Sequence, residues 1–393
     1  MKHTIHFGFL SHLSQRAIIP LLALLGFLLT GCRPVAATPL PPAYTLTVIN
    51  GFGSGQYPAG STVHVWANPY TQGWTFDTWR GDTQPLPDIR SMHATMLMPA
   101  QDVQIAASYK QIPVWSASQA NISGRAVYYF FPPSGYKGVI VFFHGSGGDA
   151  REWANLGMER RHFFDDAIAD GYAIVAIDSA DRVNKQWDLN PSPASNSDLK
   201  AVKAILTAFR ADGQMSATTP VYGVGMSQGG RFAALAGYTL NMNASAIWVG
   251  AGHEQIMEIT NVPTMWCLAD HDPIIDREEA HAQYSQLLDR GVDALFYIHS
   301  PAPLYPLYFV NIEGIDEAAS ERLFSELKSQ GYLDENNFLI ANPRLSKWEK
   351  HIGLEYSESA RLDIQDRLFV AYGEHAFYSD CDHFVLDFFN SHP

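Results

Sequence analysis

The sequence predicts an α/β fold, with a mostly parallel central sheet flanked by helices, preceded by a small all-β domain. Three observations carry this prediction. From about residue 113 onward, short and almost continuous apolar runs recur, as in strands that are buried on both faces of a sheet. Helical patterns separate several of these runs. Within residues 43–111, the apolar residues are instead β-branched and alternate with polar ones, which is typical of β structure.

The N-terminal residues 1–31 have the pattern of a signal peptide. Lys2 and Arg16 are their only charges, and an uncharged apolar run of 14 residues, 17–30, follows Arg16. Such a run is too short to span a bilayer comfortably and suits the core of a signal peptide. We therefore expect an exported protein.

The sequence LTGC at 29–32 resembles the lipobox of bacterial lipoproteins, whose cysteine is lipidated and becomes the new N-terminus. The resemblance implies a membrane anchor at Cys32. Arg33, in place of the aspartate that often retains such proteins at the inner membrane, favours the outer membrane, facing the periplasm or the cell surface. The alternative is ordinary secretion with cleavage near Ala36 or Ala37.

Residues 32–42 are Pro-rich and predict an extended tether between the anchor and the folded chain. The β domain at 43–111 follows, with Gly-rich turns such as NGFGSG between its short runs. Its motifs G-x-Y-x-x-G, F-x-x-W-x-G-D and MPA-x-D-V resemble, in this order, the divergent internalin B-type repeat of bacterial surface proteins. We expect Phe76 and Trp79 in its core, with a sugar-binding role for Trp66 or Trp74 as the alternative.

The catalytic chemistry is expected at Ser227, in the sequence Gly225-Met226-Ser227-Gln228-Gly229. An apolar strand-like run precedes this serine and a helical pattern follows it, which is the context of a nucleophile elbow. A serine hydroxyl needs a base, and the base needs a carboxylate that orients it. The alternative is a Gly-rich turn without a catalytic role.

Residues 113–393 resemble the α/β-hydrolase superfamily, in which the acid and then the histidine follow the serine along the chain. The resemblance implies Asp272, in CLADHDPII, as the acid, with Asp270 as the weaker candidate. It implies His375 as the base, because the sequence G-x-H-x-F follows an apolar run at 367–371, interpreted as the last strand, and precedes a closing helix. His299 and His383 remain alternatives for the base.

The Gly-rich turn FFHGSGGD at 142–149 resembles the superfamily's oxyanion loop. The backbone N–H groups of Ser146 and Gln228 would then bind the oxyanion, with His144 packed beneath the loop. A phosphate-binding loop is the alternative, but no Lys-Ser or Lys-Thr pair follows and the glycine spacing differs.

The chain departs from the superfamily pattern by a helical insertion at about 301–362. It contains a predicted helix at 316–331 and a small hairpin at 332–340. The insertion is either a lid or wall of the substrate cleft or a separate packing subdomain. Trp187, in a segment at the same sheet edge, is expected to line the cleft and bind substrate.

Composition excludes several partners and cofactors. Removal of residues 1–31 deletes two positive charges and shifts the net charge from −14 to −16, which disfavours nucleic acid. Cys267 and Cys381 alone cannot form a zinc site. We expect no metal and no cofactor. These two cysteines either form a disulfide or remain as buried thiols.

The leading hypothesis is a membrane-anchored serine hydrolase that cleaves carboxylic esters through an acyl-enzyme, with free, polymeric or polysaccharide-linked esters as substrates. The alternatives are a serine peptidase of the prolyl-oligopeptidase type and a surface adhesin with an inactive hydrolase domain. The sequence carries no propeller-like repeats, which argues against the peptidase. The presence of Ser227, Asp272 and His375 together argues against the adhesin.

Overall fold

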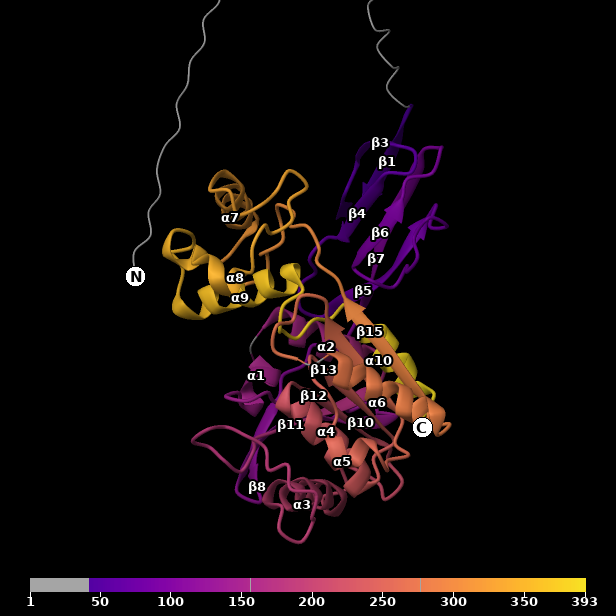
Figure 1. The fold of residues 1–393 in the computed structure, drawn as a ribbon, viewed down its shortest axis with the longest axis vertical. Helices are drawn as coiled ribbons and strands as arrows, with labels where there is room; N and C mark the ends of the chain where they lie inside the picture. Colours follow the sequence, from indigo (N-terminus) through magenta and orange to yellow (C-terminus); the bar gives the residue numbers. More distant parts are fainter. Residues whose placement is uncertain (1–41, 156, 276) are drawn as a thin grey trace, which may run out of the picture. The chain divides into compact units, whose positions relative to one another are not determined.

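The computed structural model describes residues 42–155, 157–275 and 277–393. The expected signal peptide, the lipidated Cys32 and nearly all of the tether lie outside these residues. The fold is an α/β-hydrolase fold preceded by a small all-β domain, as the sequence predicted (Figure 1).

The β domain consists of two sheets around one core. The first sheet has the order β3-β1-β7-β5 and the second has the order β2-β4-β6. The first is made of β1 (Ala43–Ile49), β3 (Gly55–Pro58), β5 (Trp74–Gly81) and β7 (Val103–Gln111). The second is made of β2 (Gly51–Phe52), β4 (Thr62–Ala67) and β6 (His93–Leu97). Phe76 and Trp79 are buried in the core between them, as expected from the sequence.

The catalytic domain is built on an eight-stranded sheet of order β15-β14-β13-β12-β10-β11-β9-β8. The six strands from β10 to β15 run parallel, whereas β8 and β9 form an antiparallel edge. The parallel strands are β10 (Gly138–Phe143), β11 (Tyr172–Ile177), β12 (Val221–Met226), β13 (Ala244–Trp248), β14 (Thr264–Ala269) and β15 (Ala294–His299). The antiparallel edge consists of β8 (Ser118–Ile122) and β9 (Arg125–Phe130).

Helices cover both faces of this sheet because successive strand residues point to opposite sides. Along β10, Ile140 and Phe142 pack with one group of helices, and Val139, Val141 and Phe143 pack with the other. The first group is α1 (Ala150–Asn155), α2 (Met158–Ala169) and α10 (Asp382–Asn390). The second is α3 (Ser197–Ala211), α4 (Gln228–Leu240), α5 (Glu254–Met257) and α6 (Arg277–Asp289).

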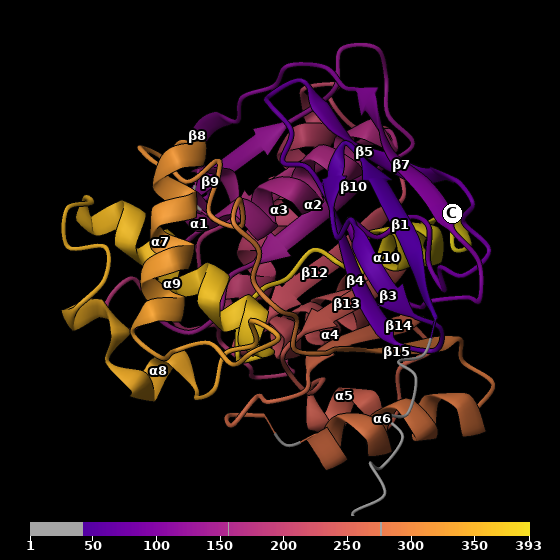
Figure 2. The same ribbon diagram turned by 90° about the horizontal axis from the view of Figure 1, so that it is seen from above.

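The insertion after β15 has a hydrophobic core of its own. Its helices are α7 (Glu317–Ser329), α8 (Pro343–Ser346) and α9 (Glu358–Tyr372), with a short 3-10 turn at Trp348–Lys350 (Figure 2). The expected helix at 316–331 is α7, and the expected hairpin is reduced to an isolated antiparallel bridge between Leu333 and Leu339.

One element differs from the prediction. The apolar run at 367–371, interpreted as the last strand, forms the end of helix α9, which extends beyond the expected end of the insertion. The reason is a helical spacing of buried residues over several turns, at Ala360, Ile364, Leu368 and Ala371. Ser357 accepts the N-terminal capping bond, and Gly373 ends the helix in a left-handed conformation.

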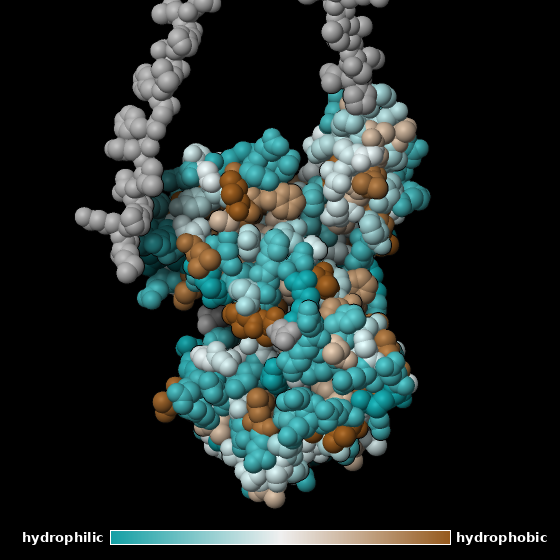
Figure 3. Space-filling view, viewed as in Figure 1, coloured by the Kyte–Doolittle hydropathy of each residue, from teal (hydrophilic) through white to brown (hydrophobic). Residues whose placement is uncertain are grey.

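The surface carries separate hydrophobic patches among hydrophilic residues on the face shown in Figure 3. Single exposed apolar residues of this kind are normal for a folded domain. Within residues 42–393, leaving aside positions 156 and 276, no helix combines the length and the apolar character needed to cross a membrane.

Candidate active site

Ser227 lies on a strained turn between strand β12 and helix α4. Its backbone has φ 55° and ψ −121°, a conformation that non-glycine residues rarely adopt. A Cβ at Gly225 would approach the carbonyl oxygen of Gly229 to 2.0 Å, and one at Gly229 would approach that of Phe143 to 2.3 Å. Glycine is therefore required on both sides of Ser227, and the turn has the geometry of a nucleophile elbow.

The elbow is held against its neighbours by backbone hydrogen bonds. The N–H of Ser227 donates to Trp248 on β13 at 2.8 Å, and the carbonyl of Ser227 accepts from Gly230 in α4 at 2.9 Å. The turn after β10 lies close by, since a Cβ built at Gly145 would be 3.6 Å from the Cβ of Ser227. The carboxyl ends of β10 and β12 thus bring the serine next to the predicted oxyanion loop.

Asp272 and His375 are in direct contact. The Nδ1 atom of His375 lies 2.8 Å from the Oδ2 atom of Asp272, although the two residues are far apart in sequence. The Oδ1 atom of Asp272 also accepts the backbone N–H of Ile274 at 2.8 Å, which fixes the carboxylate. Asp270, the other candidate acid, forms an ion pair with Arg277 at 3.1 Å instead.

His299, an alternative base, has both ring nitrogens engaged in structural contacts. Its Nδ1 atom lies 2.7 Å from Asp380 and its Nε2 atom lies 2.7 Å from the carbonyl oxygen of Val370. The carboxylate of Asp380 raises the pKa of His299 against the opposing effect of burial. The ring is buried and stacks on Tyr378, so His299 has no nitrogen left for a reacting hydroxyl.

His383, the other alternative, lies in helix α10. Its Nε2 atom is 2.9 Å from a carboxylate oxygen of Asp88 in the β domain. Its side chain therefore joins the two domains.

The insertion supports the loop that carries His375. Arg344 of α8 donates to both carboxylate oxygens of Glu374, at 2.9 and 3.2 Å, and the Glu374 side chain is fully buried. The acid loop is bonded to the same segment, because the N–H of His271 donates to Gly373 at 2.8 Å. The insertion is thus connected to the catalytic edge, by which we mean the carboxyl ends of β10, β12 and β14.

The predicted oxyanion donors flank the elbow. Ser146 is exposed in the turn after β10. Gln228 is the first residue of α4, so its N–H has no acceptor within the helix. His144 is buried beneath the turn and accepts the N–H of Ser179 at 3.2 Å, while burial lowers its pKa. Its structural role agrees with the expectation.

Trp187 does not line a cleft, which corrects the prediction. The side chain is 3% exposed and stacks on Phe232 with ring centroids 4.4 Å apart. Its indole N–H donates to the carbonyl oxygen of His144 at 2.7 Å, and its backbone N–H donates to the Gln228 side chain at 2.9 Å. Trp187 therefore supports the oxyanion turn from below, in the segment that follows β11.

Arg160 of α2 was not singled out by the sequence. Its guanidinium lies 3.7 Å from the sulfur of Met226, the residue before Ser227, and 3.7 Å from a carboxylate oxygen of Asp366 on α9. It stands in the charged run MERRHFFDD, where no pattern distinguishes it from surface residues. It brings one positive charge next to the elbow.

Cys267 and Cys381 are both buried as free thiols, with their sulfur atoms 3.1 Å apart. The two thiols are therefore in contact, and their oxidation to a disulfide stays a prediction. Within the described part of the chain, no three His, Cys, Asp or Glu side chains are arranged to hold a metal ion.

Comparisons with known families agree with both resemblances. Residues 140–376 match the model of the alpha/beta hydrolase family, and residues 44–113 match that of the divergent InlB B-repeat domain. Among curated proteins, none matches this chain.

Solved structures similar to this chain include several esterases. An esterase of Pyrococcus furiosus has 11% identity and a TM-score of 0.39, with 55% of this chain and 91% of that chain covered. An acetyl xylan esterase from Aspergillus awamori has 11% identity and a TM-score of 0.36, covering 44% of this chain and 78% of the other. A ferulic acid esterase has 14% identity and a TM-score of 0.38, with 46% and 88% covered.

Proposed function

The chain belongs to the alpha/beta hydrolase family, and from that premise we propose that it is a serine hydrolase that cleaves carboxylic esters through an acyl-enzyme intermediate. Ser227 is the nucleophile, His375 is the general base and Asp272 orients the histidine. The observation that carries the proposal is the 2.8 Å contact between Asp272 and His375 in a chain whose Ser227 has the backbone of a nucleophile elbow.

In the proposed reaction, the Oγ atom of Ser227 attacks the ester carbonyl carbon while Nε2 of His375 accepts the hydroxyl proton. Asp272 accepts a hydrogen bond from the Nδ1–H of His375, which keeps the ring in the required tautomer and stabilises the imidazolium. The protonated His375 then gives its proton to the leaving alcohol. Water, activated by the same histidine, hydrolyses the acyl-enzyme and regenerates Ser227.

The oxyanion is bound by the backbone N–H groups of Ser146 and Gln228 in this proposal. Support comes from the closeness of Gly145 to Ser227 and from the unsatisfied N–H at the start of α4. The positive end of the α4 dipole points to the same place, which favours negative charge there. Donors of this kind typically contribute about 10²–10³ in rate each.

The proposal also includes export and anchoring at the cell envelope through a lipidated Cys32. It rests on the sequence LTGC at 29–32 and on the apolar run before it. Cys32→Ser should move the protein from the membrane fraction to the soluble periplasmic fraction. If the variant still sediments with outer membranes, another feature holds the protein there.

A kinetic comparison of three proteins tests the proposed reaction. Wild type, Ser227→Ala and a control, Ser192→Ala, are assayed with p-nitrophenyl esters, feruloyl esters, acetylated xylan and peptides. Ser192 lies in an exposed loop and has no part in the site, so the control should hydrolyse esters at the wild-type rate. Loss of ester hydrolysis in Ser227→Ala alone supports the proposal, whereas activity on peptides only would favour a peptidase.

A further inference from the structure

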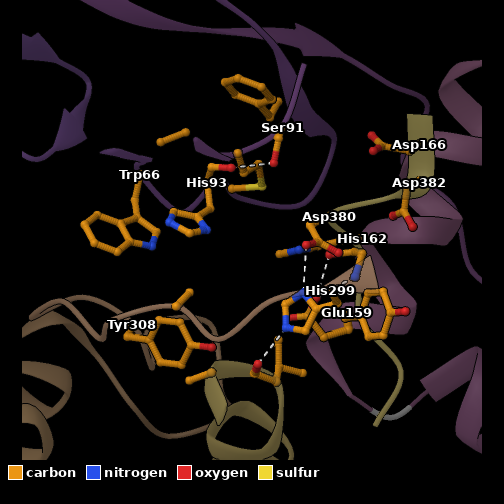
Figure 4. A pocket seen from close by; sticks show the side chains of 18 of the residues that line it. Trp66, Ser91, His93, Glu159, His162, Asp166, His299, Tyr308, Asp380 and Asp382 are labelled. Atoms are coloured by element: carbon orange, nitrogen blue, oxygen red, sulfur yellow. Dashed lines mark hydrogen bonds and ion pairs between the residues drawn. The ribbon is translucent and has the colours of Figure 1, made fainter. Parts of the chain in front are cut away.

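A cavity of about 100 Å³ lies between the β domain and the catalytic domain (Figure 4). Its lining comes from strands β4, β5 and β6 of the β domain, from helices α2 and α9, from the end of β15 with the segment after it, and from the start of α10 with the loop before it. The volume is several times what one water molecule requires. None of the residues proposed for catalysis is among those that line it.

Two of the carboxylates in the cavity are each paired with a basic side chain, although the Oδ1 atom of Asp380 has no hydrogen-bond partner among the described residues. Glu159 forms an ion pair with Arg367 and accepts from the backbone and hydroxyl of Ser379, at 2.9 and 2.6 Å. Asp380 contacts His299 at 2.7 Å and accepts from Tyr297 at 2.8 Å.

Two further carboxylates, Asp166 and Asp382, have no such cation. Asp382 is 1% exposed, and neither of its carboxylate oxygens has a hydrogen-bond partner among the described residues. Asp166 accepts one hydrogen bond, from Thr75 at 2.6 Å. Both side chains lie on the same side of the cavity in Figure 4. Burial raises the pKa of each carboxyl group, and the carboxylate of Asp166 raises the pKa of Asp382 further.

The other basic side chains at the cavity are committed elsewhere or neutral. Arg90 pairs with Asp387 and His383 pairs with Asp88. Burial lowers the pKa of His93 to about 3 and also lowers the pKa of His162, so neither imidazole supplies a positive charge at neutral pH. An unpartnered buried carboxylate is costly, and the cost is removed only by a proton or by a bound cation.

The chemistry of the walls indicates which cation fits. Within the described residues, no three carboxylate, imidazole or thiol ligands converge as a metal ion requires. Aromatic side chains, Trp66, Tyr305 and Tyr308, line the cavity together with the carboxylates. Aromatic faces attract organic cations, and carboxylate oxygens accept from N–H donors.

We propose that this cavity binds a small organic ammonium ion, a protonated primary amine, whose N–H groups donate to Asp382 and Asp166. The proposal does not depend on the proposed ester hydrolysis. The site is close in sequence to the proposed base, because Asp382, the first residue of α10, follows His375 by seven residues. An amine bound here therefore stabilises the segment that carries His375, and raises the thermal stability of the whole chain.

Thermal unfolding of the protein in amine-free phosphate buffer tests the proposal. Methylammonium chloride should raise the Tm relative to sodium chloride at matched ionic strength, by roughly 2–4 °C once the amine exceeds its Kd about tenfold. Tetramethylammonium chloride, which has no N–H donor, should give no rise, and neither should calcium chloride.

The variant Asp382→Asn separates binding from general salt effects. It removes an unpartnered charge at constant shape, so its Tm without amine should be higher than that of wild type, and methylammonium should no longer raise it. Asp166→Asn provides a second variant with the same expected loss of the amine effect. Equal Tm values in all salts, a rise with calcium alone, or an amine effect that persists in both variants would overturn the proposal.

Discussion

Two histidine–aspartate pairs of almost equal geometry lie in different regions of this chain. His375 and Asp272 are 2.8 Å apart at the catalytic edge, and His299 and Asp380 are 2.7 Å apart in the cavity between the domains. The two pairs differ in what the second ring nitrogen of each histidine contacts. His299 uses its second nitrogen to bind the carbonyl of Val370, whereas among the described residues only the Nδ1 side of His375 has a partner.

A histidine–aspartate contact alone therefore does not identify a base. Availability of the second nitrogen and its approach to a nucleophile distinguish a catalytic pair from a structural one. The cavity pair lies in a region with several buried carboxylates, where the histidine compensates negative charge. The pair at the catalytic edge instead lies on the loops that follow β14 and α9.

The largest expected effect comes from replacing the two histidines in parallel. His375→Ala should lower kcat for p-nitrophenyl esters by on the order of 10⁴–10⁶, because it removes the base. His299→Ala should keep most activity per folded molecule but lose about 3–5 kcal/mol of stability, because Asp380 is left buried without its partner. Kinetics combined with thermal unfolding measures both. A dead but stable His299→Ala protein would reverse the two assignments.

The next largest effect is expected when each aspartate is replaced by asparagine, because the two variants should distinguish the catalytic pair from the structural pair. Asp272→Asn keeps the shape but favours the wrong tautomer of His375, so kcat should fall by about 10⁴ at nearly unchanged stability. Asp380→Asn should affect stability and leave the kcat of the folded fraction within a few fold. If both variants lose activity equally, the cavity pair belongs to the catalytic machinery as well.

A smaller effect is expected where the insertion touches the catalytic loop. Arg344→Met removes the partner of the buried Glu374, next to His375, and should lower kcat roughly 10–100-fold through displacement of the base. KM should change little. Arg344→Lys should recover part of the rate, and adding Glu374→Gln to Arg344→Met should recover stability. No change in kcat for Arg344→Met would make the insertion a packing element only.

The smallest effect concerns stability alone and reports the protonation of Asp166 in the cavity. Burial raises the pKa of Asp166 to about 6, whereas an unfolded chain titrates near 3.9. The protonated group therefore contributes stability that is fully present below about pH 4 and is lost as the pH rises through about 6. In amine-free buffer, the free energy of unfolding of wild type should fall by on the order of 2–3 kcal/mol across this pH range, relative to that of Asp166→Asn. Parallel stability profiles of the two proteins would show that Asp166 titrates normally.

Local patterns predicted most of the fold. The apolar runs that became β10 to β14 are buried at every position of the strand, except for a half-buried Met226 at the end of β12, and such runs are readable without tertiary information. The run at 367–371 has a similar apolar composition, but the residues before it continue it into helix α9. A run this short does not by itself distinguish a strand from a helix. Trp187 was misplaced because burial of an aromatic ring by a polar loop depends on distant residues such as Phe232.

The candidate site was predictable to the extent that its residues stand in local motifs. Ser227, Asp272 and His375 each follow a recognisable pattern, and two of them meet in the structure. Arg160 and Arg344 have no such pattern, because their positions depend on how α2 and the insertion pack. The cavity was not predictable at all, since its lining comes from segments that only the tertiary fold brings together.

A fluorophosphonate probe reports directly whether Ser227 is the nucleophile of an ester hydrolase. Wild type is treated with the probe, digested and analysed by peptide mass spectrometry, with Ser227→Ala and heat-unfolded protein as controls. We expect one adduct, on Ser227, formed only by folded protein and accompanied by loss of ester hydrolysis at equal stoichiometry. An adduct on another residue with loss of activity, or full hydrolysis by unlabelled Ser227→Ala, would show that Ser227 is not the nucleophile.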